Sequence, residues 1–98
     1  PTFIKDVKKF LSIFNNSKIL WLEIIAKSNY EEIRPGVKKR IIEYNKILKD
    51  LLQDNFIPIK DKVEKVNGFN NDRIHWNKSG HQAVAEQILL KIKKINQN

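Results

Sequence analysis

The apolar residues of the chain form three stripes with helical spacing. In each stripe they recur every three or four positions, which is typical of helices that bury one face. The stripes comprise Phe3, Val7, Phe10, Leu11 and Phe14; Val37, Ile41, Tyr44, Leu48, Leu51 and Leu52; and Val84, Ala85, Ile88, Leu89, Ile92 and Ile95. We therefore predict three amphipathic helices, the first ended by residues 15–17 and the second by Asp54 and Asn55.

Two short apolar runs separate the predicted helices. Residues 18–25 are mostly apolar and too few for a typical helix, which favours a parallel strand covered on both faces. Residues 56–59 predict a second strand, in which Pro58 indicates a sheet edge or a strand end because proline has no N–H. A short helix is expected over residues 60–67, and a polar loop over residues 26–35.

The order strand, helix, strand, helix predicts an α/β fold with parallel strands and flanking helices. Two strands cannot cover their own faces and edges in water. We therefore expect the sheet to be completed by further strands, supplied either by a missing half of the domain or by another copy of the chain.

The composition narrows the classes to which the protein can belong. At 98 residues the chain forms at most one small domain, and no apolar run reaches the roughly 18 residues that a membrane-spanning helix needs. There is no cysteine for disulfides or thiolate metal ligands. We expect no membrane span, and the composition indicates no particular cellular compartment.

The formal net charge of +8 raises the question of an anionic partner such as nucleic acid. The lysines are scattered over the predicted helices and interleaved with acidic residues, and only three of the 19 basic residues are arginine. This pattern is typical of solvated helix faces. We therefore do not expect nucleic acid to be a partner.

The candidate chemistry lies in residues 72–81, which read D-R-I-H-W-N-K-S-G-H. Asp72 and His75 supply two of the three parts of a serine-hydrolase triad. A histidine can take the proton of a hydroxyl nucleophile, and an aspartate can hold the imidazole in the correct tautomer and stabilise its cation. Ser79 and Gln82 have the spacing of a capping box, which predicts the start of the last helix.

The block D-x-I-H-W-N-x-x-G-H, followed by an amphipathic helix, resembles the last conserved block of the SGNH, or GDSL, hydrolases. The preceding buried strand, the long helix containing Tyr44 and Asn45, and the short strand are similar to that family's C-terminal half. The resemblance implies a three-layer α/β/α, flavodoxin-like fold and hydrolysis of carboxylic esters without a cofactor or metal. It also implies that Asp72 is the orienting acid and His75 the general base.

The family's nucleophile and oxyanion-hole blocks have no counterpart in the sequence. The chain has glycine at Gly36, Gly68 and Gly80 and serine at Ser12, Ser17, Ser28 and Ser79. None of these begins a G-D-S or G-x-N-D sequence. We therefore interpret residues 1–98 as the C-terminal half of one hydrolase domain, inactive without the half that carries the nucleophile. The alternative is a non-catalytic remnant, or pseudo-hydrolase, that acts in binding or assembly.

Three further residues are candidates for contact with an ester substrate. Tyr30 and Arg34 follow the first predicted strand, and the carboxyl ends of parallel strands border the ligand crevice of α/β proteins. Trp76 either lines the acyl pocket or packs beneath the loop.

The remaining polar residues near the motif have structural interpretations. Asn77 is expected to hold the loop through bonds from its side chain to the backbone. A metal site of Asp72, His75 and His81 is the alternative for these ligand types, although packing or capping is the preferred role of His81. Glu23 interrupts the first apolar run and marks either a strand end or a place for a partner's charge.

Overall fold

The computed structural model describes residues 2–14 and 18–96, which are mostly helical with one small parallel sheet. The elements in chain order are α1 (Thr2–Ile13), β1 (Trp21–Leu22), the 3₁₀ helix η1 (Ser28–Glu32), α2 (Val37–Leu52), the 3₁₀ helix η2 (Gln53–Asn55), β2 (Phe56–Ile57), α3 (Lys60–Lys65) and α4 (Lys78–Asn96). The structure is therefore mixed α/β, and each predicted helix is present. The predicted end of the first helix, at residues 15–17, lies outside the described residues.

β1 and β2 pair in parallel, as predicted. Their register sets Trp21 opposite Phe56 and Leu22 opposite Ile57. Both strands are shorter than the predicted ranges of 18–25 and 56–59. β2 ends early because the N–H of Ile59, the next residue that faces β1, donates to the Glu23 carboxylate and not to a strand carbonyl, and because the chain enters α3 at Lys60.

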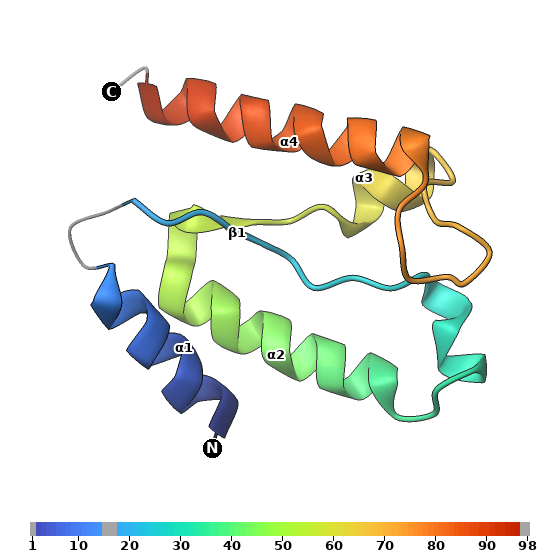
Figure 1. The fold of residues 1–98 in the computed structure, drawn as a ribbon, viewed down its shortest axis with the longest axis horizontal. Helices are drawn as coiled ribbons and strands as arrows, with labels where there is room; N and C mark the ends of the chain where they lie inside the picture. The colour runs from blue at the N-terminus through green and yellow to red at the C-terminus, as the bar shows by residue number, and fades with distance from the viewer. Residues whose placement is uncertain (1, 15–17, 97–98) are drawn as a thin grey trace.

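Helices lie on both sides of the strand pair, with α3 and α4 on one side and α1 and α2 on the other (Figure 1). Each side has its own hydrophobic core. The core beneath α4 consists of Ile25, Ile57, Ile59, Val63, Phe69 and Val84, and the core beneath α1 and α2 consists of Val7, Leu48 and Leu52. Leu22 packs against the first core and Trp21 against the second, so β1 is covered on both faces.

Asn45 of α2 fastens this helix to the segment that continues β1. Its side-chain amide donates to the Ile24 carbonyl, and its amide oxygen accepts the Ile24 N–H, each at 2.8 Å. Both bonds lie on the edge of the first strand that faces away from β2. At this position Asn45 takes the hydrogen bonds that a neighbouring strand would make.

Glu23 marks the end of β1. Its carboxylate accepts the N–H groups of Ile59 (2.8 Å) and Lys60 (2.9 Å), at the start of α3. A carboxylate is favourable there because the first N–H groups of a helix have no partner within the helix. The interpretation as a strand end is confirmed, and the charge is satisfied within the chain.

α4 buries a narrower stripe than the sequence indicated. Ala83 and Val84 are buried and Ile88 packs against the core, whereas Ala85 is exposed and Leu89 is 56% exposed. The prediction was wrong for Ala85, Leu89 and Ile92, the last of which is 40% exposed, because only one side of the helix faces the strand pair. Within residues 2–14 and 18–96, no helix is both long and apolar enough to cross a bilayer.

Candidate active site

Residues 68–77 form a hairpin-like loop that leads from α3 to α4. The loop is closed by an antiparallel bridge between Phe69 and Trp76 and by backbone hydrogen bonds of 2.8 Å from Asn77 to Gly68 and from Asn70 to His75. At its tip, the N–H of Arg73 donates to the Asn70 carbonyl (2.9 Å) and closes a turn. This backbone places Asp72 at the tip and His75 on the returning arm.

Asp72 and His75 are in direct contact. Nδ1 of His75 lies 2.5 Å from Oδ2 of Asp72. The other carboxylate oxygen, Oδ1, accepts the backbone N–H groups of Ile74 and His75, each at 3.0 Å. Every one of these partners lies within three residues of Asp72, so the pairing is a property of the local turn.

The hydrogen bonds keep Asp72 ionised. The N–H of Ile74, followed by the side chain and N–H of His75, lowers the pKa of Asp72 from 3.8 to about 2. The Asp72 and His75 side chains are 47% and 79% exposed, so hydrogen bonding and not burial sets this value. Of the two neutral tautomers of His75, a carboxylate beside Nδ1 favours the one with its proton on Nδ1. That tautomer leaves Nε2 as the proton acceptor.

Arg73 ties the tip of the loop to η1 and the residues before it. Its guanidinium donates to the Asn29 carbonyl (3.2 Å) and pairs with the Glu32 carboxylate (3.0 Å), and its own carbonyl accepts the Lys27 N–H (2.8 Å). Arg73 has a φ of 66°, in the left-handed region that residues other than glycine rarely adopt. These contacts hold the strained backbone of the tip against the segment that follows β1.

Asn77 anchors the other end of the loop. Its side-chain amide donates to the carbonyls of Asn67 (2.8 Å) and Phe69 (3.2 Å). Its amide oxygen accepts the N–H of Gly80 (2.9 Å) in the first turn of α4. The expected role of Asn77, side-chain bonding that holds the loop, is confirmed.

Asn77 is also the cap of α4, which begins at Lys78. The predicted capping box of Ser79 and Gln82 is therefore wrong, because Ser79 already lies inside the first helical turn. The sequence carried the signal for the correct cap, since asparagine is among the preferred capping residues and stands three residues before Gly80.

Gly80 packs backbone to backbone against Gly68. A Cβ on Gly80 would lie 2.1 Å from the Gly68 carbonyl oxygen, and one on Gly68 would lie 2.6 Å from the Cα of Gly80. Any side chain at either position would force the two segments apart. The glycine pair therefore lets α4 begin directly against the base of the loop.

An open groove of about 540 Å³ lies beside the tip of the loop, between the end of the first strand and α2. Its lining is mostly apolar, with Ile24, Ile33, Val37, Ile41, Tyr44 and Ile74 among its residues. Tyr30 and Arg34, the predicted substrate contacts, also line it. Ile74 is the one residue of the Asp72–His75 loop among the lining residues, so the groove that Tyr30 and Arg34 line reaches this loop, but Asp72 and His75 do not line it.

Trp76 lies elsewhere. It packs against the core beneath α4, and its ring meets that of His81 edge to face at 5.3 Å. It is not part of the groove that Tyr30 and Arg34 line. Within the described ranges, no three or more His, Asp or Glu side chains are arranged to hold a metal ion, so the alternative site of Asp72, His75 and His81 does not form there.

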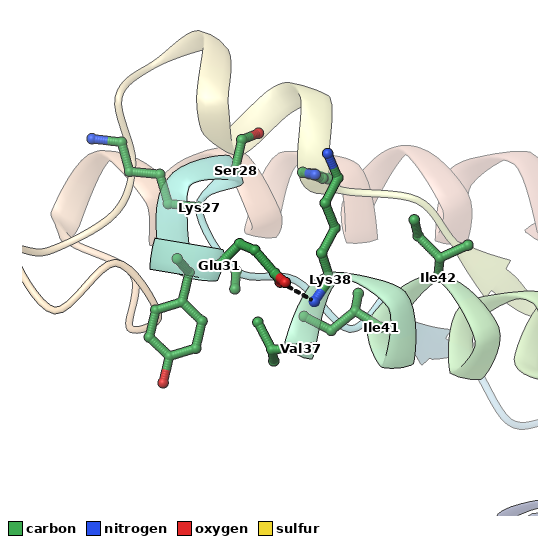
Figure 2. Close-up of a pocket in the computed structure, with 10 residues that line it drawn as sticks. Lys27, Ser28, Glu31, Val37, Lys38, Ile41 and Ile42 are labelled. Carbon is green, nitrogen blue, oxygen red and sulfur yellow. Dashed lines mark hydrogen bonds between the residues drawn. The ribbon is translucent and has the colours of Figure 1, made fainter. Parts of the chain in front are cut away.

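A smaller cavity of about 50 Å³ lies between η1 and the start of α2 (Figure 2). The Glu31 carboxylate beside it accepts the N–H groups of Gly36 (2.6 Å) and Lys38 (2.8 Å). These two backbone hydrogen bonds lower the pKa of Glu31. Neither Asp72 nor His75 lines this cavity, and Glu31 binds N–H groups at the start of α2, whose N-cap residue is Gly36.

In residues 2–14 and 18–96, no serine hydroxyl is hydrogen-bonded to His75. Ser28 donates to the Glu64 carboxylate (2.9 and 3.1 Å), and Ser12 donates to the Lys9 carbonyl (2.7 Å). The Asp72–His75 pair therefore has no hydroxyl partner in this part of the chain.

Comparison of the chain with protein-family models, with curated proteins and with solved structures finds no match. Functional inference therefore rests on the motif and on the geometry of the loop.

Proposed function

We propose that the chain is the acid–base half of a serine ester hydrolase of the SGNH type. The single observation that carries the proposal is the contact between Asp72 and Nδ1 of His75, within a loop that leads directly into the last helix. The carboxylate is ionised and leaves Nε2 available as a general base. The required nucleophile would come from a second half of the domain.

The arrangement of the elements supports this proposal. Parallel strands with helices on both sides are compatible with a partial three-layer, flavodoxin-like domain. In such sheets, ligands bind beyond the carboxyl ends of the strands. The Asp72–His75 loop contacts the segment after β1 through the hydrogen bond from the Lys27 N–H to the Arg73 carbonyl, and this position supports the proposal.

The proposed reaction is hydrolysis of a carboxylic ester through an acyl-enzyme. Nε2 of His75 takes the proton of the nucleophilic serine as its oxygen attacks the ester carbonyl. The same proton passes to the leaving alcohol when the tetrahedral intermediate collapses. Water then attacks the acyl-serine, again losing a proton to His75, which returns it to the serine oxygen as the acid is released. Asp72 stabilises the imidazolium in both steps.

The exposure of the pair favours the half-domain over a complete catalyst. His75 is 79% exposed, whereas acyl transfer needs donors for the developing oxyanion in a site that excludes water. We therefore expect this chain alone to hydrolyse no ester and to bind no fluorophosphonate.

The test combines the chain with a polypeptide that carries the family's G-D-S and G-x-N-D blocks. The mixture should hydrolyse p-nitrophenyl acetate, and a fluorophosphonate should label the serine of the G-D-S block. His75→Ala should lower kcat/KM at least about 100-fold, the usual contribution of a general base. His81→Ala is the matched control, because it removes the other histidine without touching Asp72, and its kcat/KM should change less than threefold.

An active mixture that keeps its rate with His75→Ala would refute the assigned role. Absence of both labelling and hydrolysis would favour the alternative, a non-catalytic module used in binding or assembly.

A further inference from the structure

The edge of β1 that faces away from β2 carries open backbone groups. Glu23 donates its N–H to the Ile57 carbonyl, so its peptide groups face β2. Successive residues of a strand point their peptide groups in opposite directions, so those of Leu22 and Ile24 face away from β2. Asn45 binds both groups of Ile24. Those of Leu22 have no hydrogen-bond partner in residues 2–14 and 18–96.

The groove of about 540 Å³ continues from this edge. Ile24 belongs to both, because it lies on the open edge and lines the groove. Beyond it, Ile33 is 52% and Ile74 is 39% exposed, and both line the groove. An unpaired strand edge beside an exposed apolar surface is a typical place for an extended peptide to bind as an added strand.

The charged residues that line the groove are all basic. Arg34 and Arg40 line it, and none of its lining residues is acidic. Neither arginine makes an ion pair within the described ranges. The whole chain carries a net charge of +8, so a segment seated here is favoured if it is acidic.

We propose that this edge and groove bind an extended, acidic segment of a second polypeptide, which adds a third strand beside Leu22. The segment pairs with the N–H and C=O of Leu22 and leaves the sheet at Ile24, whose backbone Asn45 already occupies. Its apolar side chains then enter the groove, and its carboxylates meet Arg34 and Arg40. The added chain thus ends beside the Asp72–His75 loop.

A second copy of this chain fits the surface less well. Two copies that paired through their β1 edges would bring two identical arginine pairs and two net charges of +8 together. Like charges across an interface suppress association. The docking proposal rests on the proposed function in one respect: it takes the second polypeptide to be the half of the domain that carries the nucleophile. Docking itself is measured without catalysis.

The test uses amide hydrogen exchange of the ¹⁵N-labelled chain. In the free chain, the Leu22 N–H should have a protection factor at least tenfold below that of the Glu23 N–H, which is bound to Ile57. The probe is an acetylated and amidated pentapeptide of alternating glutamate and valine, at millimolar concentration. It should protect Leu22 and leave Ile24 unchanged. The same peptide with lysine in place of glutamate should protect Leu22 less.

Charge reversal supplies the matched variants. Arg34→Glu with Arg40→Glu should weaken binding of the glutamate peptide roughly three- to tenfold and strengthen that of the lysine peptide. Lys93→Glu with Lys94→Glu changes the net charge equally on the last turn of α4, away from the groove, and should leave the preference intact.

Three results would overturn the proposal. These are no protection of Leu22 by the glutamate peptide, equal protection by both peptides, and protection that rises with chain concentration alone, which would assign the edge to self-association. If the peptide docks but His75→Ala does not lower the rate of the reconstituted enzyme, the proposed function is refuted and the docking proposal is not.

Discussion

Replacement of Gly80 by alanine tests the contact on which the candidate site is built. Taken alone, alanine in a helix should stabilise α4 by about 1 kcal/mol relative to glycine. The new Cβ would, however, lie 2.1 Å from the Gly68 carbonyl oxygen, where an ordinary contact begins near 3.4 Å. The backbones must therefore separate by about 1 Å or more.

Gly68 cannot yield freely, because it is bonded on both sides. Its N–H donates to the Val63 carbonyl and its carbonyl accepts the Asn77 N–H, each at 2.8 Å. Overpacking costs about 1–3 kcal/mol, and weakening the two hydrogen bonds adds about 1 kcal/mol each. Less the gain in helix propensity, we expect Gly80→Ala to destabilise the protein by about 2–4 kcal/mol.

The assay is urea unfolding followed by far-ultraviolet circular dichroism and by the fluorescence of Trp76 and Trp21. Gln82→Ala is the matched control, since Gln82 is exposed two residues further along α4. It should change the free energy of unfolding by less than about 0.5 kcal/mol. Unchanged or increased stability of Gly80→Ala would show that the backbones of Gly68 and Gly80 are not in contact. It would refute the claim that this contact holds the start of α4 against the base of the loop.

Further predictions concern single groups. The carboxyl carbon of Asp72 should titrate by NMR with a pKa of about 2 in place of 3.8. Because the folded pKa is depressed, the Asp72 contribution to stability is complete above pH 3.8 and is lost as the pH falls through about 2; a midpoint near 4 would contradict the turn geometry. Asn45→Ala should cost about 1–3 kcal/mol in urea unfolding, because both backbone groups of the half-buried Ile24 lose their partner, whereas exposed Lys46→Ala should be near neutral. Glu23→Ala should cost about 1 kcal/mol by removing the cap of α3, and Glu23→Gln, which keeps an oxygen acceptor, should cost less; equal losses would assign the effect to charge alone.

The sequence alone was sufficient where the physics is local. Helical spacing of apolar residues located the helices, because one buried face repeats every three or four residues. The Asp72–His75 pair was equally accessible, since each hydrogen bond that holds it lies within the turn between the two residues. The capping box at Ser79 was also a local pattern, but the helix is capped by Asn77, whose side-chain oxygen accepts the Gly80 N–H.

Only the tertiary structure decided the features that depend on distant partners. Glu23 caps a helix whose first residue is 37 positions away, and Asn45 replaces a strand neighbour for Ile24, 21 positions earlier. Ile74 reaches the groove that Tyr30 and Arg34 line because Arg73 ties the loop tip to η1. Sequence periodicity reports which residues prefer to be buried or helical, and it does not report which distant backbone groups need a partner. Those partners are chosen when the strands and helices pack.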